Sequence, residues 1–506
     1  MRISQALPLT CIASALLFTV LFHGQTMGIN VLLFELPLLA ALWWLRRPEP
    51  SLEVITTMAG TLLSAAFVVI HGSDLARTVN ILALLVAVGV LLAPNLHALH
   101  HALMLSVRHI LPAQRAFLQS TQGSNAARVV PRFGRSTAGT LLAVLLIVVL
   151  FMVIYQSSNP HFDRAMDRFW ASVEELFEHV DLSLAFTFAL GLATTNMVLQ
   201  HSQHPRLLEW MGRSSDMLFR QRARRPATSV LALRYELRTG VLLLGLLNLL
   251  LLVVNVLDVR HVWFDFSFNG QYLKQFVHEG TYLLILSILL GAGIVLWFFR
   301  ANQNFYRSNR TLKALAFFWL AQNAVLAISV GIRNSWYIHH YALAYKRIGV
   351  VFFLLAVIIG LVLVGLKVRD RRSRHFLLRW NAFAVYTILL LMASVNWDVL
   401  IARYNFSKKD QSFIHLDFMV TLSDKALPWL AQEQHALEQI DTHNQSMLDS
   451  DSFSRSLYME PKAYGDLIAE RSARFVDDYP KRSWRSWTWA DARAYRIMQP
   501  GVSQIP

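Results

Sequence analysis

Cysteine and charged residues are both scarce in this chain. The 506 residues include one cysteine, Cys11, so no disulfide can form within the chain. Asp, Glu, Lys and Arg together make up 16% of the sequence, whereas about a quarter is usual for soluble domains. A soluble globular protein of this length is therefore disfavoured, and the single cysteine says nothing about the redox compartment.

Signatures of the common enzyme classes are also lacking. The sequence has no G-x-x-x-x-G-K-[ST], no G-x-S-x-G and no H-E-x-x-H motif. Membrane glycosyltransferases that use lipid-linked sugars usually carry an acidic pair in an early external loop, but the first such loop, His23–Met27, has no acid. These absences argue against an enzyme. One transferase candidate remains, the His339-His340 pair in an aromatic loop.

Long apolar runs are what the chain has in abundance. Hydrophobic residues make up 55% of it, and the mean hydropathy is +0.40. A helix needs about 20 apolar residues to cross a hydrocarbon core of about 30 Å. The stretches that approach this length are Ser4–Phe22, Gly28–Leu45, Val54–Ile70, Thr78–Leu96, Thr137–Tyr155, Leu182–Gln200, Thr239–Leu257, Gly280–Phe299, Leu312–Ile332, Gly349–Leu366 and Phe376–Asn396. The sequence therefore predicts an all-α, polytopic transmembrane helix bundle of about eleven spans.

The segments that flank these spans add detail. No A-x-A-like cleavage site follows Phe22, which indicates that the first span is a retained helix rather than a signal peptide. Leu99–Arg135 is expected to be an amphipathic cytoplasmic piece broken at Pro112 and at Gly123-Ser-Asn125, and Asp163–Asp181 an external helix. After Asn405 the composition becomes charged. We therefore expect a transmembrane domain over residues 1–404 and a small, mainly helical tail domain over residues 405–506.

Basic residues predict the orientation. They gather in alternate loops: Arg46 and Arg47; Arg108 to Arg135; eight arginines from Arg206 to Arg238; Arg300 to Lys313; and Lys367 to Arg379. Lys and Arg resist translocation, so these loops are expected in the cytoplasm with the N-terminus, and the tail outside. The net charge of +15 is then explained by anionic lipid headgroups at the cytoplasmic loops, without a nucleic-acid partner.

Several spaced motifs carry a family resemblance. They are Gly28-Ile-Asn30, Leu32-Leu-Phe34, His278-Glu-Gly-Thr-Tyr282, Trp319-Leu-Ala-Gln-Asn323, Arg333-Asn334, Ala344–Val350, Asn396-Trp-Asp398, Ala402-Arg-Tyr-Asn405 and Leu422–Pro428. Together they resemble a bacterial multi-pass membrane family known as domain of unknown function 4153/4173, over roughly two thirds of the chain. The resemblance implies location in the bacterial inner membrane. It implies no activity, because none is established for the family.

Polar residues converge on the predicted external ends of the spans. The candidates are His278, Glu279, Arg333, Tyr337, His339, His340, Lys346, Arg347, Asp398 and Arg403. Such a mixture suits a polar ligand or an ion pathway. It equally suits structural caps, in which Arg333, Lys346 or Arg347 pairs with Glu279 or Asp398.

A second set of polar residues lies within the spans. Asn248, Asn255 and Asp258 share one helix face, as do Gln322, Ser329 and Arg333, and Asn323 lies beside them in sequence. Hydrogen bonding between helices is one interpretation, and a vestibule that opens outward is the other. Glu35 lies in a short span, where a carboxylate is either functional, paired or reaches the headgroups.

Histidines cluster near two predicted inner helix ends. His97, His100 and His101 have the spacing H-x-x-H-H, and His201 and His204 lie at another inner end. Helical histidines at i and i+4 can share a metal, but no cysteine accompanies them and no nearby carboxylate is evident. The sequence favours interfacial histidines, and we expect no metal and no cofactor.

Three functional hypotheses follow. The first is a non-enzymatic envelope signalling or assembly protein whose external face binds another envelope protein. The second is a transporter or permease that uses the intramembrane polar residues. The third is a transferase that acts on a lipid-linked substrate. No pair of interrupted spans suggests the inverted repeats common in transporters, which favours the first hypothesis.

Overall fold

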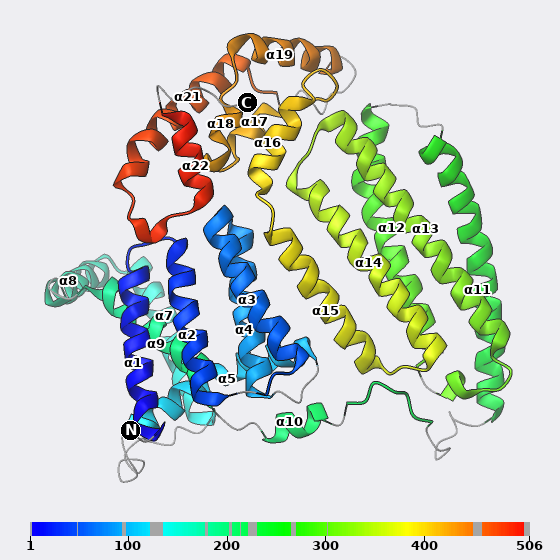
Figure 1. Cartoon of the computed structure of the whole chain (residues 1–506), viewed down its shortest axis with the longest axis horizontal. Coiled ribbons are helices and arrows are strands. Elements are labelled where there is room, and N and C mark those ends of the chain that lie inside the picture. The colour runs from blue at the N-terminus through cyan, green and yellow to red at the C-terminus, as the bar shows by residue number, and fades with distance from the viewer. Residues whose placement is uncertain are drawn as a thin grey trace. The chain divides into compact units, whose positions relative to one another are not determined.

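The computed structural model of the chain is helical throughout the part that it describes. It describes residues 3–47, 49–93, 98–121, 135–177, 181–201, 205–212, 214–220, 230–264, 270–300, 302–448 and 458–499, with no strand among them. The α-helices are α1 Ile3–Phe22, α2 Ile29–Arg46, α3 Leu52–His71, α4 Asp74–Leu92, α5 Leu99–Thr121, α7 Arg135–Ser158, α8 Pro160–Phe177, α9 Leu182–Leu199, α10 Pro205–Gly212, α11 Val230–Asp258, α12 Gly270–Phe298, α13 Arg310–Tyr341, α14 Tyr345–Asp370, α15 Arg374–Ala393, α16 Trp397–Ser407, α17 Leu416–Val420, α18 Leu427–Leu430, α19 Gln434–Leu448, α21 Pro461–Asp478 and α22 Trp489–Met498 (Figure 1). The predicted all-α class is confirmed for these residues.

Seven helices in the described ranges are long and apolar enough to cross a membrane. They are Leu52–His71, Asp74–Leu92, Leu182–Leu199, Leu231–Phe264, Arg310–Tyr341, Tyr345–Asp370 and Arg374–Ala393. Leu7–Phe22, Ile29–Leu45 and Tyr282–Phe298 are shorter apolar helices. The remaining expected span lies in α7, where the side chains of residues 135–143 fall outside the described part. A set of membrane-type helices is therefore confirmed, and the count of about eleven stays a prediction.

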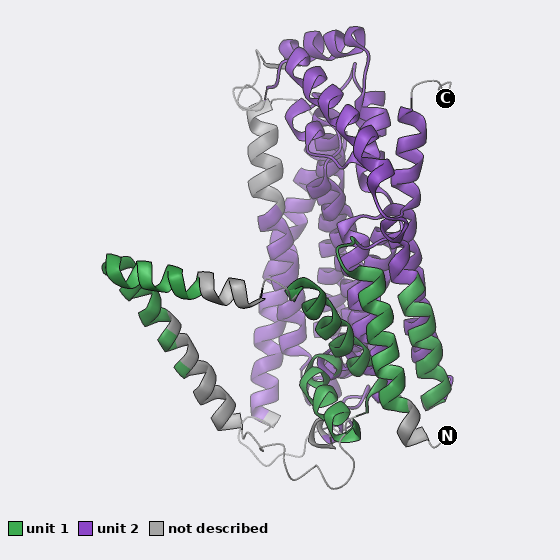
Figure 2. Cartoon of the chain, turned by 90° about the vertical axis from the view of Figure 1, so that its left-hand side faces the viewer, with its two compact units in different colours: residues 1–26, 33–48, 106–203 green, residues 27–32, 49–105, 204–506 purple. Residues whose placement is uncertain are grey.

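The chain forms two compact units, which Figure 2 colours separately. Unit 1 comprises residues 1–26, 33–48 and 106–203. Within it α1 packs along α9, where Gly191 admits the ring of Phe18, and α7 and α8 meet at a sharp corner (Figure 2). Unit 2 comprises residues 27–32, 49–105 and 204–506, so the tail and most of the long helices belong to the same unit. The expected domain boundary between residues 404 and 405 stays a prediction.

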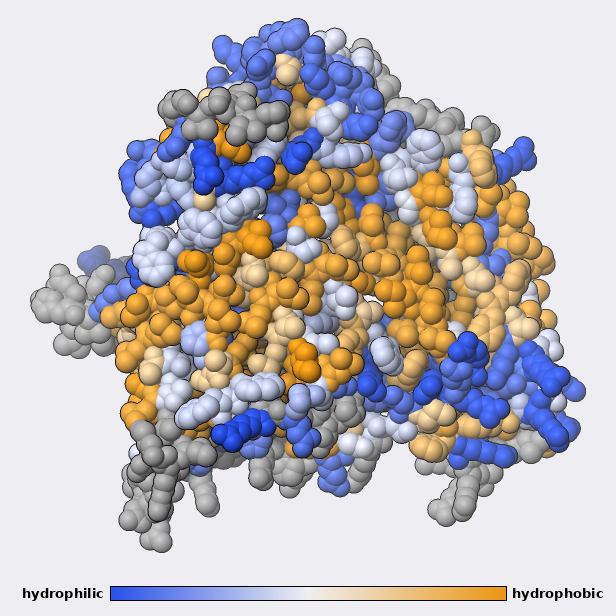
Figure 3. Space-filling model, viewed as in Figure 1, coloured by the Kyte–Doolittle hydropathy of each residue, from blue (hydrophilic) through white to orange (hydrophobic). Residues whose placement is uncertain are grey.

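The helices of unit 2 pack in an order that differs from their order in the chain. α3 pairs with α4, α15 contacts both, α14 lies against α15, and α13 contacts α14, α12 and α11. Apolar side chains cover the middle of these helices, whereas hydrophilic ones gather over the C-terminal helices and at the far ends of α11 and α14 (Figure 3). This banding is what a bilayer requires of helices that cross it.

Local signals set the helix ends as expected from capping chemistry. Ser51 accepts from the backbone N–H of Val54 at 3.3 Å, and Ser73 accepts from that of Ala76 at 3.2 Å. Between them Gly72 adopts a left-handed conformation with φ 58°, which closes α3 and allows α4 to start at once. The turn between α3 and α4 is thus encoded by two adjacent residues, Gly72 and Ser73.

The expected break at Pro112 is wrong. α5 runs from Leu99 to Thr121 through Pro112 without interruption. Proline removes one backbone hydrogen bond and usually kinks a helix, but tertiary contacts can hold the helix together. Here Ala113 is fully buried, and the next residue, Gln114, donates to the carbonyl of Ala193 in α9 at 3.0 Å.

Candidate functional site

A ladder of amide side chains joins α11 to α13 inside unit 2. Gln322 Nε2 donates to Asn248 Oδ1 at 2.7 Å and to the carbonyl of Asn248 at 3.1 Å. Asn248 Nδ2 donates to the carbonyl of Leu315 at 3.0 Å, and Asn255 Nδ2 to that of Gln322 at 3.1 Å. All three amides are buried. The structure therefore brings three of the predicted intramembrane residues together, in the arrangement of interhelical hydrogen bonds.

An ion pair continues this ladder toward the C-terminal end of α11. Arg333 Nη2 lies 2.5 Å from Asp258 Oδ1, and both residues are buried. Trp263 Nε1 donates to Ser329 Oγ at 2.8 Å, and Trp336 Nε1 donates to the carbonyl of Val262 at 3.0 Å. The helical segment Val259–Phe264, which continues α11, is thus joined to α13 on both sides of Arg333 in the sequence. Asp258 is thus a carboxylate partner of Arg333, whereas the pairings with Glu279 or Asp398 that the cap interpretation supposes stay predictions.

The two other intramembrane candidates have different surroundings. Asn323 donates from Nδ2 to the carbonyl of Trp319 within α13 at 2.7 Å. It borders Gly291 of α12, where an added Cβ would lie 3.2 Å from Asn323 Oδ1. Glu35 belongs to α2 in unit 1 and is 3% exposed. Asn323 therefore serves local packing, and Glu35 is a buried carboxylate.

The turn between α13 and α14 is organised around Arg347. Its guanidinium donates to the carbonyl of Tyr341 at 2.5 Å and to that of Ala342, and it lies 4.4 Å from the ring centroid of Tyr337. Asn334 Nδ2 donates to the carbonyl of Arg347 at 3.0 Å. Ala342 has φ 60°, a left-handed value that is uncommon for alanine. Arg347 therefore caps the end of α13 and fixes a strained turn.

Asp398 belongs to a separate network at the start of α16. Its carboxylate accepts from the hydroxyls of Tyr345 and Ser423. Lys346 and Arg403 are exposed. The side chains of His278 and Glu279 lie outside the described residues. Among the described residues, Arg347 and Asp398 thus each organise a network of hydrogen bonds, and the predicted external cluster as a whole stays a prediction.

The tail contacts these turns through hydrogen bonds that the sequence did not reveal. Asn405 pairs with the backbone of Leu343 in both directions, at 2.7 and 3.0 Å. Ser412 Oγ donates to the carbonyl of His339 at 2.6 Å, and the N–H of Phe413 to that of His340 at 2.7 Å. The only feature of the sequence that pointed to these contacts is that Asn405 ends Ala402-Arg-Tyr-Asn405, one of the motifs of the family resemblance.

Two further contacts extend the tail to other helix ends. Lys425 Nζ donates to the carbonyl of Gly72 between α3 and α4 at 3.1 Å. The N–H of Ile29 donates to the carbonyl of Trp487 at 3.0 Å, and Gly28 lets the chain pass, because an added Cβ would lie 2.6 Å from Ser486 O. The tail is thereby held at the α13–α14 turn, at the α3–α4 turn and at the start of α2.

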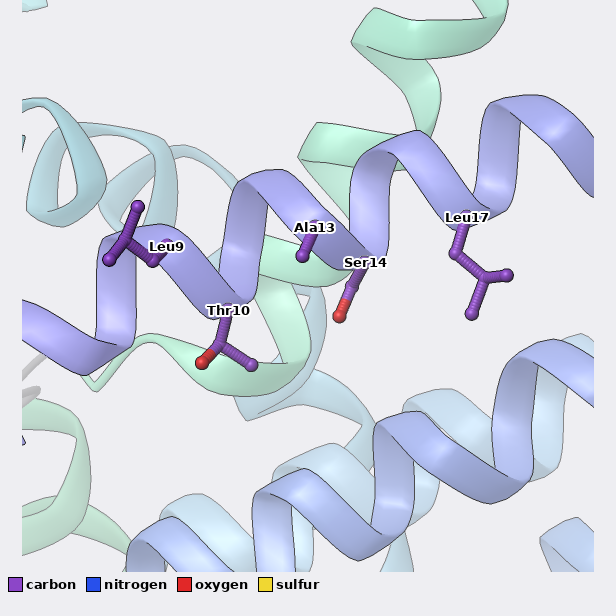
Figure 4. A pocket seen from close by; sticks show the side chains of 5 residues that line it. All are labelled: Leu9, Thr10, Ala13, Ser14 and Leu17. Carbon is purple, nitrogen blue, oxygen red and sulfur yellow. The ribbon is translucent and has the colours of Figure 1, made fainter.

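Two hollows among the described residues are open and mainly apolar. One of about 390 Å³ on α1 is lined by Leu9, Thr10, Ala13, Ser14 and Leu17, all from that single helix (Figure 4). Another of about 530 Å³ lies along α11 and α13 and includes Asn255, Arg260 and Gln322.

Comparisons with known proteins agree with the resemblance noted in the sequence. No curated protein matches the chain, and no solved structure matches it. The family model for the domain of unknown function DUF4153 matches residues 34–433, which include the ladder, both networks and the first part of the tail. The chain belongs to the family defined by this domain of unknown function, DUF4153.

Proposed function

We propose that this protein is a non-enzymatic signalling or assembly protein of the bacterial inner membrane. In this proposal it crosses the bilayer about eleven times with its N-terminus in the cytoplasm. Residues 405–506 then form a domain on the extracytoplasmic side. Another envelope protein binds this domain, together with the polar ends of the helices.

The docking of the tail is the observation that carries this proposal. Ile348 of α14 belongs to the same buried cluster as Leu416, Leu427 and Tyr464, so the tail shares its core with a long apolar helix. The hydrogen bonds at Leu343 and Gly72 add fixed points. A soluble domain held in this way presents its outer surface in a constant orientation, which suits binding to a partner rather than a moving gate.

The basic loops support the orientation. The tail lies at the ends of α3 and α13 that the distribution of Lys and Arg assigns to the outside, whereas Arg369, Arg371 and Arg374 lie at the other end of α14 and α15. Anionic headgroups of the cytoplasmic leaflet attract such residues.

Site-specific photo-crosslinking in the native bacterium tests the proposal. A photoreactive amino acid at exposed Leu467 or Glu470 in α21 should give a discrete adduct with an extracytoplasmic protein. The same substitution at exposed Tyr235, at the start of α11, is the matched control and should not give that adduct. Lack of a discrete adduct from every exposed position of α19 and α21 would contradict the proposal.

A transporter is the second candidate, and the buried Asp258–Arg333 pair is the observation in its favour. Charges within membrane helices are costly and often belong to ion or proton pathways. If the pair carries transport, neutralising both residues should abolish the phenotype of the gene although the protein still accumulates. If the pair only joins helices, a folded double variant should support that phenotype. The transferase hypothesis has no comparable observation in its favour among the described residues.

A further inference from the structure

Three histidines from distant parts of the sequence meet in unit 2. His100 and His101 lie in the first turn of α5 and His375 in the first turn of α15, and their candidate ligand atoms all lie within 4.8 Å of one another. The ring centroids of His101 and His375 are 5.2 Å apart, and those of His100 and His101 are 4.2 Å apart. Consecutive helical residues ordinarily point about 100° apart. The two rings of α5 nevertheless converge toward His375.

A short antiparallel pairing positions the third histidine. The N–H of Ser373 donates to the carbonyl of Asp216 at 2.9 Å, and the N–H of Leu218 donates to that of Arg371 at 2.9 Å. Ser373 Oγ also donates to the carbonyl of Ser215. Ser373 is at the same time the N-cap of α15. This pairing therefore fixes Asp216 beside the turn that carries His375.

The carboxylate of Asp216 faces both His375 and an arginine. Asp216 Oδ1 lies 3.9 Å from His375 Nε2, and Asp216 Oδ2 lies 3.0 Å from Arg379 Nη1. Arg379 Nη2 in turn lies 3.4 Å from Glu53 Oε1 in α3. Two carboxylates thus share one guanidinium.

Several polar atoms of the cluster have no hydrogen-bond partner among the described residues. They include both ring nitrogens of His100 and Asp216 Oδ1, all of them buried. Buried polar atoms usually have a partner, so an exception needs an explanation.

We propose that His100, His101 and His375 bind a divalent transition-metal ion, Zn²⁺, and that Asp216 orients the ring of His375. Imidazole nitrogens suit Zn²⁺, whereas Mg²⁺ and Ca²⁺ prefer sets of oxygen ligands. Two nitrogens on one tetrahedral zinc lie about 3.3 Å apart, so the rings must close by one to two ångströms through side-chain rotation. Ligating histidines commonly donate their second ring N–H to a carboxylate, which is the place of Asp216.

Such an ion would connect α5 to α15. The two helices are far apart in the chain, and the histidines lie in the first turn of each. Three protein ligands leave a fourth position for water or another ligand. The competing explanation is that three neutral rings merely pack against each other. The two explanations differ in whether the purified protein holds zinc at these residues.

A measurement of zinc binding by the full-length protein in detergent distinguishes a metal site from simple packing of the three rings. The protein is purified through a tag without histidine, stripped with a chelator, reloaded with Zn²⁺, and passed through a desalting column. Elemental analysis should find one Zn²⁺ per chain at this site. Loading with Co²⁺ should give the visible absorption of a tetrahedral site, and excess Mg²⁺ should not displace it.

Variants assign the site. His375→Gln and His100→Gln should each weaken zinc affinity by at least about 100-fold, and Asp216→Asn by about 10- to 100-fold. His435→Gln, at an exposed histidine of α19, is the matched control and should bind as the wild type does. Elution volume and helical circular dichroism show whether each variant is folded. If His375→Gln does not fold, the zinc affinity of His100→Gln tests the proposal. Wild-type protein that binds no zinc, or folded histidine variants that bind it equally well, would overturn the proposal.

Discussion

At the scale of the residue, the buried charges and amides were easier to predict than their partners. Asp258 and Arg333 each fall on a polar helix face that the spacing of residues reveals. Spacing along one helix cannot tell which other helix lies opposite, because neighbours in the bundle need not be neighbours in sequence. The pairing of these two residues across α11 and α13 therefore came only from the structure.

Losing one partner of the buried Asp258–Arg333 pair should destabilise the bundle strongly. Asp258→Asn removes the carboxylate from a buried guanidinium, which typically costs about 3–5 kcal/mol. We expect a markedly lower midpoint of thermal unfolding in detergent, and a partial recovery in the double variant Asp258→Asn/Arg333→Gln. Asp74→Asn is the control, because Asp74 is 95% exposed in its pair with Arg77 and should lose almost nothing. Equal losses in both aspartate variants would contradict this account.

His415 should make the stability of the tail depend on pH. Burial, with a smaller effect from Arg347, lowers the pKa of His415 from 6.5 to about 4. Below pH 6.5 the unfolded chain therefore binds a proton that the folded chain excludes, so stability is full above 6.5 and falls toward pH 4. The expected loss at pH 5 is about 2 kcal/mol.

Thermal unfolding between pH 7.5 and 5 measures this effect. The wild type should lose more of its midpoint temperature than His415→Gln, which cannot titrate at this position. Parallel pH profiles for the two proteins would show that His415 does not contribute.

At the scale of the element, apolar length predicted the helices well and their close crossings poorly. The long runs became α3, α4, α9, α11 and α13 to α15, because a helix satisfies its own backbone wherever it packs. The break expected at Pro112 did not occur, since contacts with α9 were invisible in the sequence. Close approaches through glycine were equally hidden.

Gly89 marks such an approach and can be tested. An added Cβ would overlap the carbonyl of Ala102, where α4 meets the start of α5. Gly89→Ala should therefore reduce the fraction of monodisperse protein in size-exclusion chromatography. The gain in helix propensity of about 1 kcal/mol should not compensate for the overlap. Gly245→Ala in α11 is the matched control, because its Cβ meets nothing within 4 Å. Equal recovery of both variants would contradict a tight α4–α5 crossing.

At the scale of the whole molecule, class and family could be predicted, whereas the sites could not. Motifs in the sequence carried the resemblance to the family, and the family model covers residues 34–433. The histidine cluster needed His375, which no local spacing connects with His100 and His101. The docking of the tail needed main-chain hydrogen bonds at Leu343 and His340, and any residue type can provide these.

The central claim is a membrane protein with its tail outside, and side-specific thiol labelling tests it most directly. The only native cysteine, Cys11, is buried, so an introduced cysteine should be the only thiol that reacts with the reagent. Gln445→Cys in the tail and Arg220→Cys between α10 and α11 are both at exposed positions. Intact spheroplasts are treated with a membrane-impermeant maleimide, and permeabilised ones serve as the reference. We expect Gln445→Cys to be labelled in both samples and Arg220→Cys only after permeabilisation; the reverse pattern, or labelling of both in intact spheroplasts, would contradict the account.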